Sequence, residues 1–506
     1  MFWKRWWNGW ILIFYFTSAG LSATFNVNST GDFVDSNPGN GVCATASGLC
    51  TLRAAVMEST SVGGADVINV PAGTYILTIP GAGENFGATG DLDLNEATIN
   101  GNGTVIIDGG SVDRVFDIYN TSIIRGVIVQ NGFAVENGGG IRCNYDCTLD
   151  EVTVRANQSQ GWGGGIRNEG DLVIYKSTIS GNSCIVHGGG ISNYGGDIIA
   201  QNSTISRNMA NFDSGGIDND NAGFAGLYSV TVAQNIADNE NDGFGNAGGI
   251  SVFSGTVYLQ NTMLANNEDN GGEAPDCAFS ISSGGHNLIG NITSCIVADD
   301  ETGNIYNTNP LLGPLGNNGG PTSTHALQFG SPAIDAGLDS ECPFIDQRGV
   351  SRPHGPHCDI GSYEYDDITF LYADNFEDGD ASDWAPNKGN WTVIAGDLTG
   401  THNRKASNIA PFSGCGVGCS VGGYVRIDTP GGRASLLAFY QDKRNLVEVI
   451  FMDDKDRIVL KQRQSGQLIA KGKFVMPIAV GVNYPVELKH LSGSLQVIID
   501  GSVIID

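Results

Sequence analysis

The charged side chains best placed to do chemistry follow one position of an internal repeat. Arg142, Arg167 and Asp218 each stand directly after an isoleucine that closes a glycine-rich tract, and Asp213 and Asp220 lie close to the last of them. If the isoleucines point inward, the residues after them point outward, because side chains alternate along a strand. Such a row of guanidinium and carboxylate groups can bind a sugar chain. With a base and a cation, it can also remove a proton beside a uronate carboxylate.

The two arginines are the first candidates for contact with an acidic polysaccharide. Arg142 and Arg167 are 25 residues apart, which is one repeat, and adjacent strands lie about 4.8 Å apart. Arginine suits bidentate binding of a carboxylate, whereas Asp218 lies two repeats beyond Arg167, too far to pair with it directly. A solvated face is the alternative interpretation of this row. Three acids are alternative partners for the arginines: Glu136, Asp146 and Glu169.

A second acidic segment offers ligands for calcium. Asp238, Glu240 and Asp242 alternate with two asparagines. Carboxylate and amide oxygens are the ligands that Ca²⁺ prefers. A solvated insertion is the alternative interpretation. Ca²⁺ is therefore the one cofactor that the sequence suggests, and no motif in the sequence requires a cofactor.

Self-similarity predicts the scaffold that positions these groups. Tracts ending in Gly-Gly-Ile recur so that successive isoleucines are 25, 25, 26 and 33 residues apart. A second motif has threonine, an apolar residue, two further residues and asparagine, with asparagine spacings of 26, 25, 26, 27 and 31. The isoleucines are Ile141, Ile166, Ile191, Ile217 and Ile250. The asparagines are Asn131, where valine replaces the threonine, and Asn157, Asn182, Asn208, Asn235 and Asn266.

Two motifs with one period indicate one structural unit per period. The runs between them are short, rich in β-branched residues and bounded by glycine and asparagine, which is typical of strands. No run has helical periodicity long enough for a helix in every repeat. A unit of this kind predicts one coil of a parallel β-helix. We expect the isoleucines to stack in the core and the asparagines to form a ladder through a turn.

The flanking segments resemble those of exported bacterial β-helix proteins. Residues 43–60, CATASGLCTLRAAVMEST, resemble the CSLREA-type segment that opens many of them, with Thr-Leu-Arg-Ala-Ala in place of Ser-Leu-Arg-Glu-Ala. INVPAGTYIL and ATINGNGTVIIDGG look like the first coils of pectate-lyase-like helices. NPLLGPLGNNGGPTSTHALQFGSPAIDAG and DQRGVSRPHGPHCDIGSYEY resemble the "choice-of-anchor Q" ending. The resemblance covers roughly residues 43–365 and implies a right-handed parallel β-helix. The family is named for its architecture and its export, so the resemblance does not imply a reaction.

The same motifs predict the domain organisation. We expect a signal peptide at 1–23, an N-terminal cap at 24–65 with a helix around residues 52–58, a β-helix at 66–300 and its end at 301–366. Alternating strands then begin, and DNFEDGDASDW resembles the first strand of concanavalin/laminin-G-like β-sandwiches, which predicts such a domain at 370–506. Further strands usually follow the last hairpin in that family. The sequence thus predicts a truncated sandwich, with an unusually short one as the alternative.

The composition fits a secreted or cell-surface bacterial protein. The net charge of −28, from 54 acidic and 26 basic residues, disfavours nucleic acid and anionic membranes as partners. Lys4 and Arg5 precede an apolar stretch, and Ala19 or Ala23 suits cleavage of a signal peptide. An uncleaved anchor is the alternative. No second long apolar run follows, so we expect no transmembrane helix in the mature chain.

Eleven cysteines favour an oxidising compartment. Zinc is the competing interpretation, since His354 and His357 precede Cys358, but no recurring Cys-x-x-Cys pairs support it. Cys184 is left over. The expected pairs are Cys43 with Cys50, Cys143 with Cys147, Cys277 with Cys295, Cys342 with Cys358, and Cys415 with Cys419.

The sequence favours a non-catalytic exported protein that binds polysaccharide or a cell-surface glycan, for example as an adhesin. Its long, mostly neutral faces suit recognition of repeated units, and the C-terminal sandwich resembles a binding module. The alternative is an enzyme that acts along the face of the helix. That enzyme would be a polysaccharide lyase or, with less support, a glycoside hydrolase.

Overall fold

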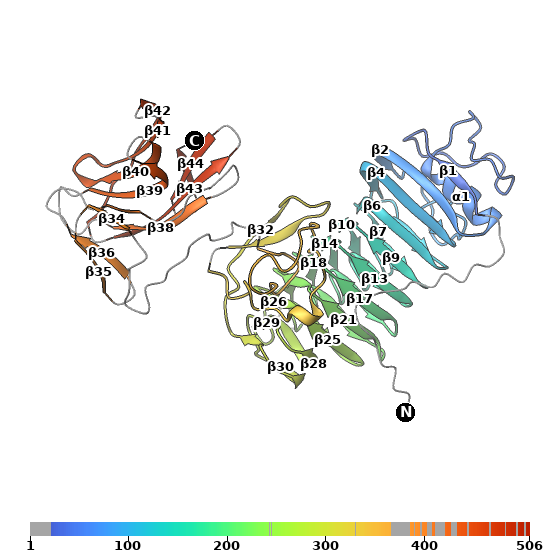
Figure 1. Cartoon of the computed structure of the whole chain (residues 1–506). Coiled ribbons are helices and arrows are strands. Elements are labelled where there is room, and N and C mark those ends of the chain that lie inside the picture. The colour runs from blue at the N-terminus through green and yellow to red at the C-terminus, as the bar shows by residue number, and fades with distance from the viewer. Residues whose placement is uncertain are drawn as a thin grey trace. The chain divides into compact units, whose positions relative to one another are not determined.

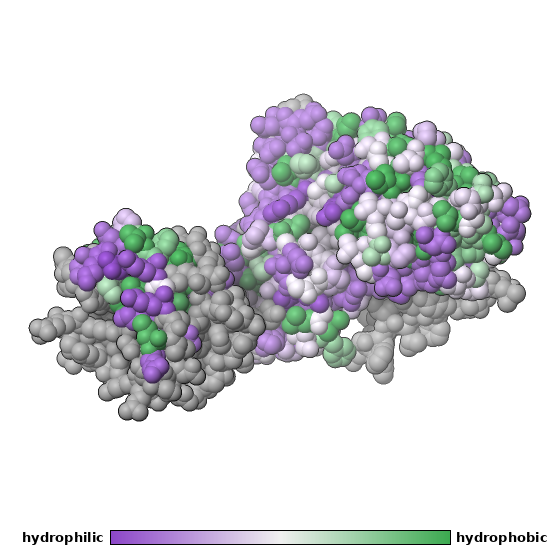
Figure 2. All heavy atoms as spheres, turned by 90° about the horizontal axis from the view of Figure 1, so that it is seen from above, coloured by the Kyte–Doolittle hydropathy of each residue, from purple (hydrophilic) through white to green (hydrophobic). Residues whose placement is uncertain are grey.

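The computed structural model describes residues 22–365, apart from residues 242, 244 and 329, and a series of strands between residues 385 and 505. The chain separates into two units, Met1–Tyr365 and Asp366–Asp506, which we describe one at a time. The predicted signal peptide lies outside the described residues except for its last two. Within the described part, no helix is long and apolar enough to cross a membrane. On the face that Figure 2 shows, hydrophobic residues are scattered among hydrophilic ones over the first unit.

The first unit is a stack of coils, each made of short strands that pair in parallel with the coils before and after it (Figure 1). Because every contact between coils joins equivalent strands, the predicted parallel β-helix is confirmed. One coil runs through β12 (Ile166–Asn168), β13 (Asp171–Tyr175), β14 (Thr178–Ser180) and β15 (Ser183–Cys184). The next coil repeats the pattern with β16 (Ile191–Tyr194), β17 (Asp197–Gln201), β18 (Thr204–Ser206) and β19 (Met209–Ala210).

The strands form three series along the stack. The isoleucine sheet, named for the residue that opens most of its strands, contains β3 (Leu92–Leu94), β5 (Phe116–Ile118), β8 (Ile141–Cys143), β12, β16, β20 (Ile217–Asp220), β24 (Ile250–Val252) and the start of β28 (Cys277–Gly284). The short sheet contains β7 (Phe133–Ala134), β11 (Gln158–Ser159), β15, β19, β23 (Ile236–Ala237) and β27 (Glu268–Asp269).

The third series, the bent sheet, supplies two strands to most coils. It begins with β1 (Thr24–Asn26), β2 (Asp66–Ile76), β4 (Ala97–Asp108) and β6 (Ser122–Gln130). Before the bend it continues with β9 (Cys147–Asp150), β13, β17, β21 (Phe224–Tyr228), β25 (Thr256–Gln260), the end of β28 and β30 (Cys295–Asp300). After the bend it continues with β10 (Thr153–Arg155), β14, β18, β22 (Thr231–Ala233), β26 (Met263–Ala265), β29 (Leu288–Ile289) and β31 (Ile305–Tyr306).

The repeat isoleucines stack in the core as predicted. They stand in register on neighbouring strands, and all five are fully buried. Phe116 and Leu92 continue the column in the preceding coils, and Cys277 continues it in the following one. Each glycine tract turns tightly enough that a side chain would collide with a neighbouring coil. A Cβ on Gly189, for example, would lie 2.3 Å from the backbone oxygen of Met209.

A ladder of buried asparagines runs between the bent sheet and the short sheet. In each step the side-chain amide of one asparagine donates to the Oδ1 of the next at 2.9 Å. The last asparagine donates to Asp276 Oδ1 at 2.8 Å, so a carboxylate ends the ladder. The members are Asn157, Asn182, Asn208, Asn235 and Asn267.

Two of the six predicted rungs were wrong. Asn266 is exposed with a positive φ of 59°, and its neighbour Asn267 is the rung. In the first coil Gly132 occupies the rung position, and its N–H donates to Asn157 Oδ1, so Asn131 is not a member. In both places the motif sits one residue out of register with the strands. Thr231 accordingly pairs with Met263, and Thr153 pairs with Ile128.

A helix closes the N-terminal end of the stack. The predicted helix at residues 52–58 is confirmed and is longer, α1 (Leu52–Val62), with the Thr51 hydroxyl accepting from the Ala54 N–H at its start. Arg53, from the CSLREA-like segment, is buried. It donates to Asp32 and to the carbonyl oxygens of Gly87 and Gly90. The predicted cap also contributes a strand to the bent sheet, because β1 pairs with β2.

Four of the five predicted disulfides are present: Cys43–Cys50, Cys143–Cys147, Cys277–Cys295 and Cys342–Cys358. Among the described residues Cys184 remains free and is buried. The pair proposed for Cys415 and Cys419 lies outside the described residues. The bridges join residues close in sequence, so they fix local turns and caps.

The segment expected to end the helix folds back along its side. Residues 310–365, with β32 (Leu312–Gly316), β33 (Thr324–Leu327) and the 3₁₀ turn η1 (Asp339–Glu341), contact several earlier coils. Gln347 Nε2 donates to Thr178 Oγ1 at 2.9 Å, and the Thr204 hydroxyl donates to Gln347 Oε1. The Ser362 N–H donates to Thr231 Oγ1 at 3.0 Å. The threonines of the second repeat motif thus anchor this folded-back segment.

The second unit contains two larger sheets, antiparallel except where β37 pairs in parallel with β39. One contains β34 (Ala385–Lys388), β37 (Ser407–Ile409), β39 (Arg433–Asp442), β40 (Asn445–Met452), β41 (Arg457–Gln464) and β42 (Gln467–Val475). The other contains β38 (Ser420–Arg426), β43 (Asn483–Leu491), β44 (Ser494–Ile499) and β45 (Ser502–Ile505). The strands β35 (Asn390–Ile394) and β36 (Asp397–Thr401) form a hairpin, and η2 (Asp453–Lys455) is a short 3₁₀ turn. Phe451 and Leu488 belong to one core that both larger sheets share, so the unit is a β-sandwich.

Substitution of two adjacent asparagines tests the register of the ladder, because Asn267 is a rung and Asn266 is not. Asn267→Ala removes the acceptor of the Asn235 amide and leaves the Val232 carbonyl and Asp276 with one donor fewer. We expect it to lower the free energy of unfolding by about 3 kcal/mol. Asn266→Gly keeps the positive φ and should change it by less than about 0.5 kcal/mol. Urea denaturation of the two variants checks this, and equal losses would place the ladder elsewhere.

Candidate functional site

Three rows of outward side chains run across the isoleucine sheet. Each row is defined by a fixed distance in sequence from the repeat isoleucine. The residue after each isoleucine forms the floor row. The residue three positions after it forms the rim row, and the residue four positions before it forms the pre-glycine row. Floor row: Asp93, Asp117, Arg142, Arg167, Ser192, Asp218, Ser251. Rim row: Asn144, Glu169, Tyr194, Asp220, Phe253. Pre-glycine row: Asn137, Trp162, His187, Asp213, Asn246.

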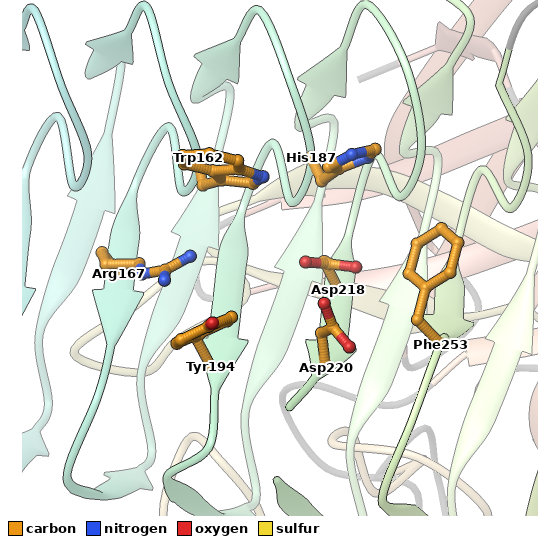
Figure 3. Close-up of a pocket in the computed structure, with 7 residues that line it drawn as sticks. All are labelled: Trp162, Arg167, His187, Tyr194, Asp218, Asp220 and Phe253. Atoms are coloured by element: carbon orange, nitrogen blue, oxygen red, sulfur yellow. The ribbon is translucent and has the colours of Figure 1, made fainter. Parts of the chain in front are cut away.

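A groove opens at Ser192, one of the two serines of the floor row. Ser192 lies between Arg167 and Asp218 and is fully buried, so the hollow is bounded by the larger residues around it. The cavity has a volume of about 620 Å³. Figure 3 shows the Arg167 guanidinium and the Asp218 carboxylate at the floor, with aromatic rings above and below. The lining residues are Trp162, Arg167, His187, Tyr194, Asp218, Asp220 and Phe253.

Arg167 is held from all sides. Its guanidinium carbon lies 4.6 Å from the centre of the Tyr194 ring and 5.6 Å from that of Trp162. Its Nε donates to Glu169 Oε1 at 3.2 Å, and its Nη1 donates to the Ser192 hydroxyl at 3.0 Å. The side chain is only 6% exposed. Cation–π contacts and charge-assisted hydrogen bonds together fix the guanidinium as part of the wall.

The two aromatic rings remain open to solvent. Trp162 is 40% exposed and Tyr194 is 45% exposed, which is unusual for large rings that could be covered by neighbouring coils. They enclose Arg167 from the pre-glycine row and the rim row, so each presents an apolar surface to the groove. Phe253 adds a third partly exposed ring one coil beyond Asp220.

Asp218 is the buried acid of the groove. Burial, with the negative charges of Asp220 and Asp213, raises its pKa to about 6, although His187 and the hydrogen bond from Ser192 act in the opposite direction. The Ser192 hydroxyl donates to its Oδ2 at 3.2 Å. Among the described residues Oδ1 has no hydrogen-bond partner. A ligand hydroxyl in the groove would supply that missing partner, since unpaired buried acceptors are costly.

His187 is paired with Asp213. Its Nδ1 lies 3.0 Å from Asp213 Oδ2, and its ring meets Phe253 edge-on with centroids 5.6 Å apart. Burial lowers the pKa of His187, but the hydrogen bond to Asp213 and the charges of Asp218, Asp213 and Asp220 outweigh burial and raise the net pKa. The groove therefore holds an imidazole that is readily protonated beside several acids.

The structure brings together most of the site residues predicted from the sequence. Arg167, Asp218 and Asp220 line the groove, and Asp213 supports it through His187. Arg142 lies on the same row but outside the lining. Glu169 lies within 4 Å of both arginines, 3.8 Å from Arg142 Nη2 and 3.2 Å from Arg167 Nε, so one of the alternative acids does neutralise them.

The predicted calcium loop is bonded locally. Asp238 Oδ2 accepts from the Gly243 N–H, and Glu240 Oε1 accepts from the Asn211 side chain. Asp242 lies outside the described residues. Nothing in the described part of this loop gathers its carboxylates around one point.

Four residues of the groove were not predicted from the sequence: Trp162, His187, Tyr194 and Phe253. The prediction followed only the residue after each repeat isoleucine. The same repeat also fixes the residue four positions before the isoleucine and the residue three positions after it. Trp162 and His187 stand directly before glycine tracts, and Tyr194 and Phe253 stand three residues after Ile191 and Ile250. An alignment of the repeats at these two positions would have shown an accumulation of aromatic residues.

The fold and the groove define a parallel β-helix protein with a groove on the outer face of one sheet. No family model and no curated protein matches the sequence. Among solved structures, the carbohydrate binding module CBM66 from Bacillus subtilis is similar at 18% identity and a TM-score of 0.22, over 24% of this chain and 78% of that one. This likeness is too distant to carry an argument about the groove.

The raised pKa of Asp218 predicts how stability depends on pH. The fold favours the protonated carboxyl, so this contribution to stability is full below the ordinary pKa of 3.8 and is lost as the pH rises through about 6. Asp218→Asn imitates the protonated form at every pH. We expect it to raise the free energy of unfolding at pH 7.5 by up to about 3 kcal/mol, with no gain near pH 4.

Urea denaturation between pH 4 and pH 7.5 measures this difference. Glu240→Gln, in an exposed segment, is the control and should shift stability equally at each pH. A constant offset for Asp218→Asn across the range would show that the carboxyl titrates normally.

Proposed function

We propose that the protein binds a polysaccharide in the groove of the isoleucine sheet. The observation that carries this proposal is the pair of exposed rings, Trp162 and Tyr194, which lie on either side of Arg167, with Asp218 lining the same groove. Sugar rings offer apolar faces to aromatic side chains and hydroxyl groups to carboxylates. A concave site with apolar walls and a few placed polar groups is the usual form of a small-ligand site.

The charge of the groove favours a neutral glycan. Arg142 and Arg167 share Glu169 as a partner, and Asp213, Asp218 and Asp220 supply further negative charge. An acidic polysaccharide would have to displace Glu169 and approach several carboxylates. The earlier hypothesis of an acidic ligand on the two arginines is therefore the less favoured form of this proposal.

The shape of the face supports binding of a chain rather than of a single sugar. Coils follow each other at about 4.8 Å, which is comparable to the length of one sugar residue. Partly exposed rings continue from the groove along the stack: Phe253 contacts Phe279 with centroids 5.6 Å apart, and His187 lies 6.3 Å from Phe212. Successive sugar residues would thus meet similar surfaces on successive coils. The disulfides and the acidic charge agree with a role outside the cell.

Binding is tested by removing the rings. We expect Trp162→Ala and Tyr194→Ala each to weaken binding of a neutral polysaccharide at least tenfold, which is about 1.4 kcal/mol. A screen of neutral glucans, mannans and xylans, with polygalacturonate and alginate for comparison, identifies the ligand, and isothermal titration measures the affinity. Phe344→Ala is the control, because Phe344 is 83% exposed on the folded-back segment. Equal weakening by all three variants, or tighter binding of polygalacturonate, would contradict the proposal.

Polysaccharide cleavage is the second candidate function. The observation that favours it is an acid with a pKa of about 6, Asp218, two residues from Asp220 and facing the His187–Asp213 pair. A carboxyl group that holds its proton near neutral pH suits general acid catalysis. Both lyase and hydrolase chemistry need such a group, and a lyase also needs the uronate that the groove charge disfavours.

An activity assay separates binding from cleavage. The binding proposal predicts that the wild-type protein releases neither unsaturated uronides, seen by ultraviolet absorbance, nor new reducing ends from any polysaccharide it binds. Release by the wild type that Asp218→Asn abolishes, with binding retained, would establish the enzyme instead.

A further inference from the structure

Three buried carboxylates meet at the N-terminal end of the floor row, far along the sheet from the groove. Asp93 on β3 pairs in register with Asp117 on β5, and Asp91 directly precedes β3. Each is at most 4% exposed. One oxygen from each of the three lies within 4.8 Å of the other two. We call these residues the acid cluster.

The positive charge near the acid cluster serves mainly one member. Arg114 Nη1 donates to Asp117 Oδ2 at 2.6 Å and lies 3.7 Å from Asp91 Oδ2. Asp117 Oδ1 accepts from the Asn144 side chain at 2.6 Å. Asp117 is thus well satisfied, whereas Asp91, which is also buried, is reached by the same guanidinium only at 3.7 Å.

Asp93 supplies an independent sign that a ligand belongs here. Its Oδ2 accepts from the Gly87 N–H. Its Oδ1 is buried and has no hydrogen-bond partner among the described residues, although the residue is only 1% exposed. A buried carboxylate oxygen without a donor is rare, and an unplaced ion is one of its ordinary causes. The oxygen without a partner therefore belongs to a member of the acid cluster.

A hollow connects Asp93 with the outside. It has a volume of about 290 Å³ and is lined by Asp93 and by Thr60, Asn85, Phe86, Asn95 and Tyr119. Apart from Phe86 these side chains carry oxygen atoms. The Tyr119 hydroxyl lies 3.0 Å from Asp117 Oδ2 and 2.9 Å from Asn85 Oδ1, so it joins the hollow to the acid cluster. An ion that entered through this hollow would reach the acid cluster, whose side chains offer oxygen ligands only.

We propose that the acid cluster binds one Ca²⁺ ion through the carboxylates of Asp91, Asp93 and Asp117, with water in the hollow completing its shell. Calcium takes six to eight oxygen ligands in flexible geometry, whereas zinc prefers histidine and cysteine. The ion adds positive charge beside Asp91 and Asp93, where Arg114 reaches Asp91 only at 3.7 Å. It also joins β3 to β5, because its ligands come from both strands.

This site differs from the calcium loop that the sequence indicated. There Glu240 is exposed and bonded to Asn211, whereas the acid cluster is buried and brought together from separate coils. Glu240→Gln is therefore a matched control that removes one acidic oxygen elsewhere on the same unit. Asp93→Asn removes the charge of the proposed ligand and keeps the acceptor for Gly87.

The experiment is titration of the full chain, freed of metal by a chelator, with calcium chloride. We expect one ion per wild-type chain and a rise in the thermal midpoint with Ca²⁺, because a ligand that binds only the folded state stabilises it. Asp93→Asn should bind at least tenfold more weakly and lose the rise, while Glu240→Gln keeps both. Mg²⁺, which demands a tighter octahedral shell, should bind more weakly than Ca²⁺.

Two results would overturn the site. One is a wild-type chain with neither calcium-dependent heat nor a shift in midpoint. The other is a loss in Glu240→Gln as large as that in Asp93→Asn. Circular dichroism establishes that Asp93→Asn is folded, and Asp91→Asn replaces it if it is not, with the same expected weakening.

Discussion

Parallel stacking in register is the constraint on which the rest of this molecule depends. Each residue of a coil lies beside its equivalent in the next coil, about 4.8 Å away, so a side chain always meets another from the same position. Apolar residues gain from this, and the column of isoleucines is fully buried. Asparagine gains as well, because one amide both donates and accepts and the pattern repeats without a break. Charged residues are destabilised by this stacking, because a charge at one position lies beside the same charge in the next coil.

The floor row shows how the chain manages that loss. Its charges come in blocks, with acids at Asp93 and Asp117, bases at Arg142 and Arg167, and an acid again at Asp218. Glu169 reaches the two arginines and Arg114 reaches Asp117 from outside the row, whereas Ser192, within the row, accepts from Arg167 and donates to Asp218. Asp93 and Asp218 are the acids of the row that keep a buried oxygen without a hydrogen-bond partner among the described residues, and at both we infer a ligand.

The sequence predicted those features that repeat with a constant offset. The isoleucine register, the outward row and the local disulfides follow from spacing alone. The ladder failed at Asn131 and Asn266, because the motif stands one residue out of register with the strands there and only the strand pairing shows this offset. The aromatic rings of the groove were missed for a different reason. Their positions are fixed by the repeat, but they are four different residue types at two positions other than the one that the prediction followed. The acid cluster also needs the stack, since Asp117 lies one coil beyond Asp91 and Asp93.

The folded-back segment determines where a pull on the chain would act. A stack of coils held by neighbour contacts peels from its ends, one coil at a time. Here the residues just before Tyr365 are bonded to Thr231, and Gln347 is bonded to Thr178 and Thr204, in the middle of the stack. Tension arriving from residues beyond 365 is therefore applied to the interior as shear across several coils, and the last coil is bypassed. The groove would thus stay intact up to the force at which those bonds to the threonines break together.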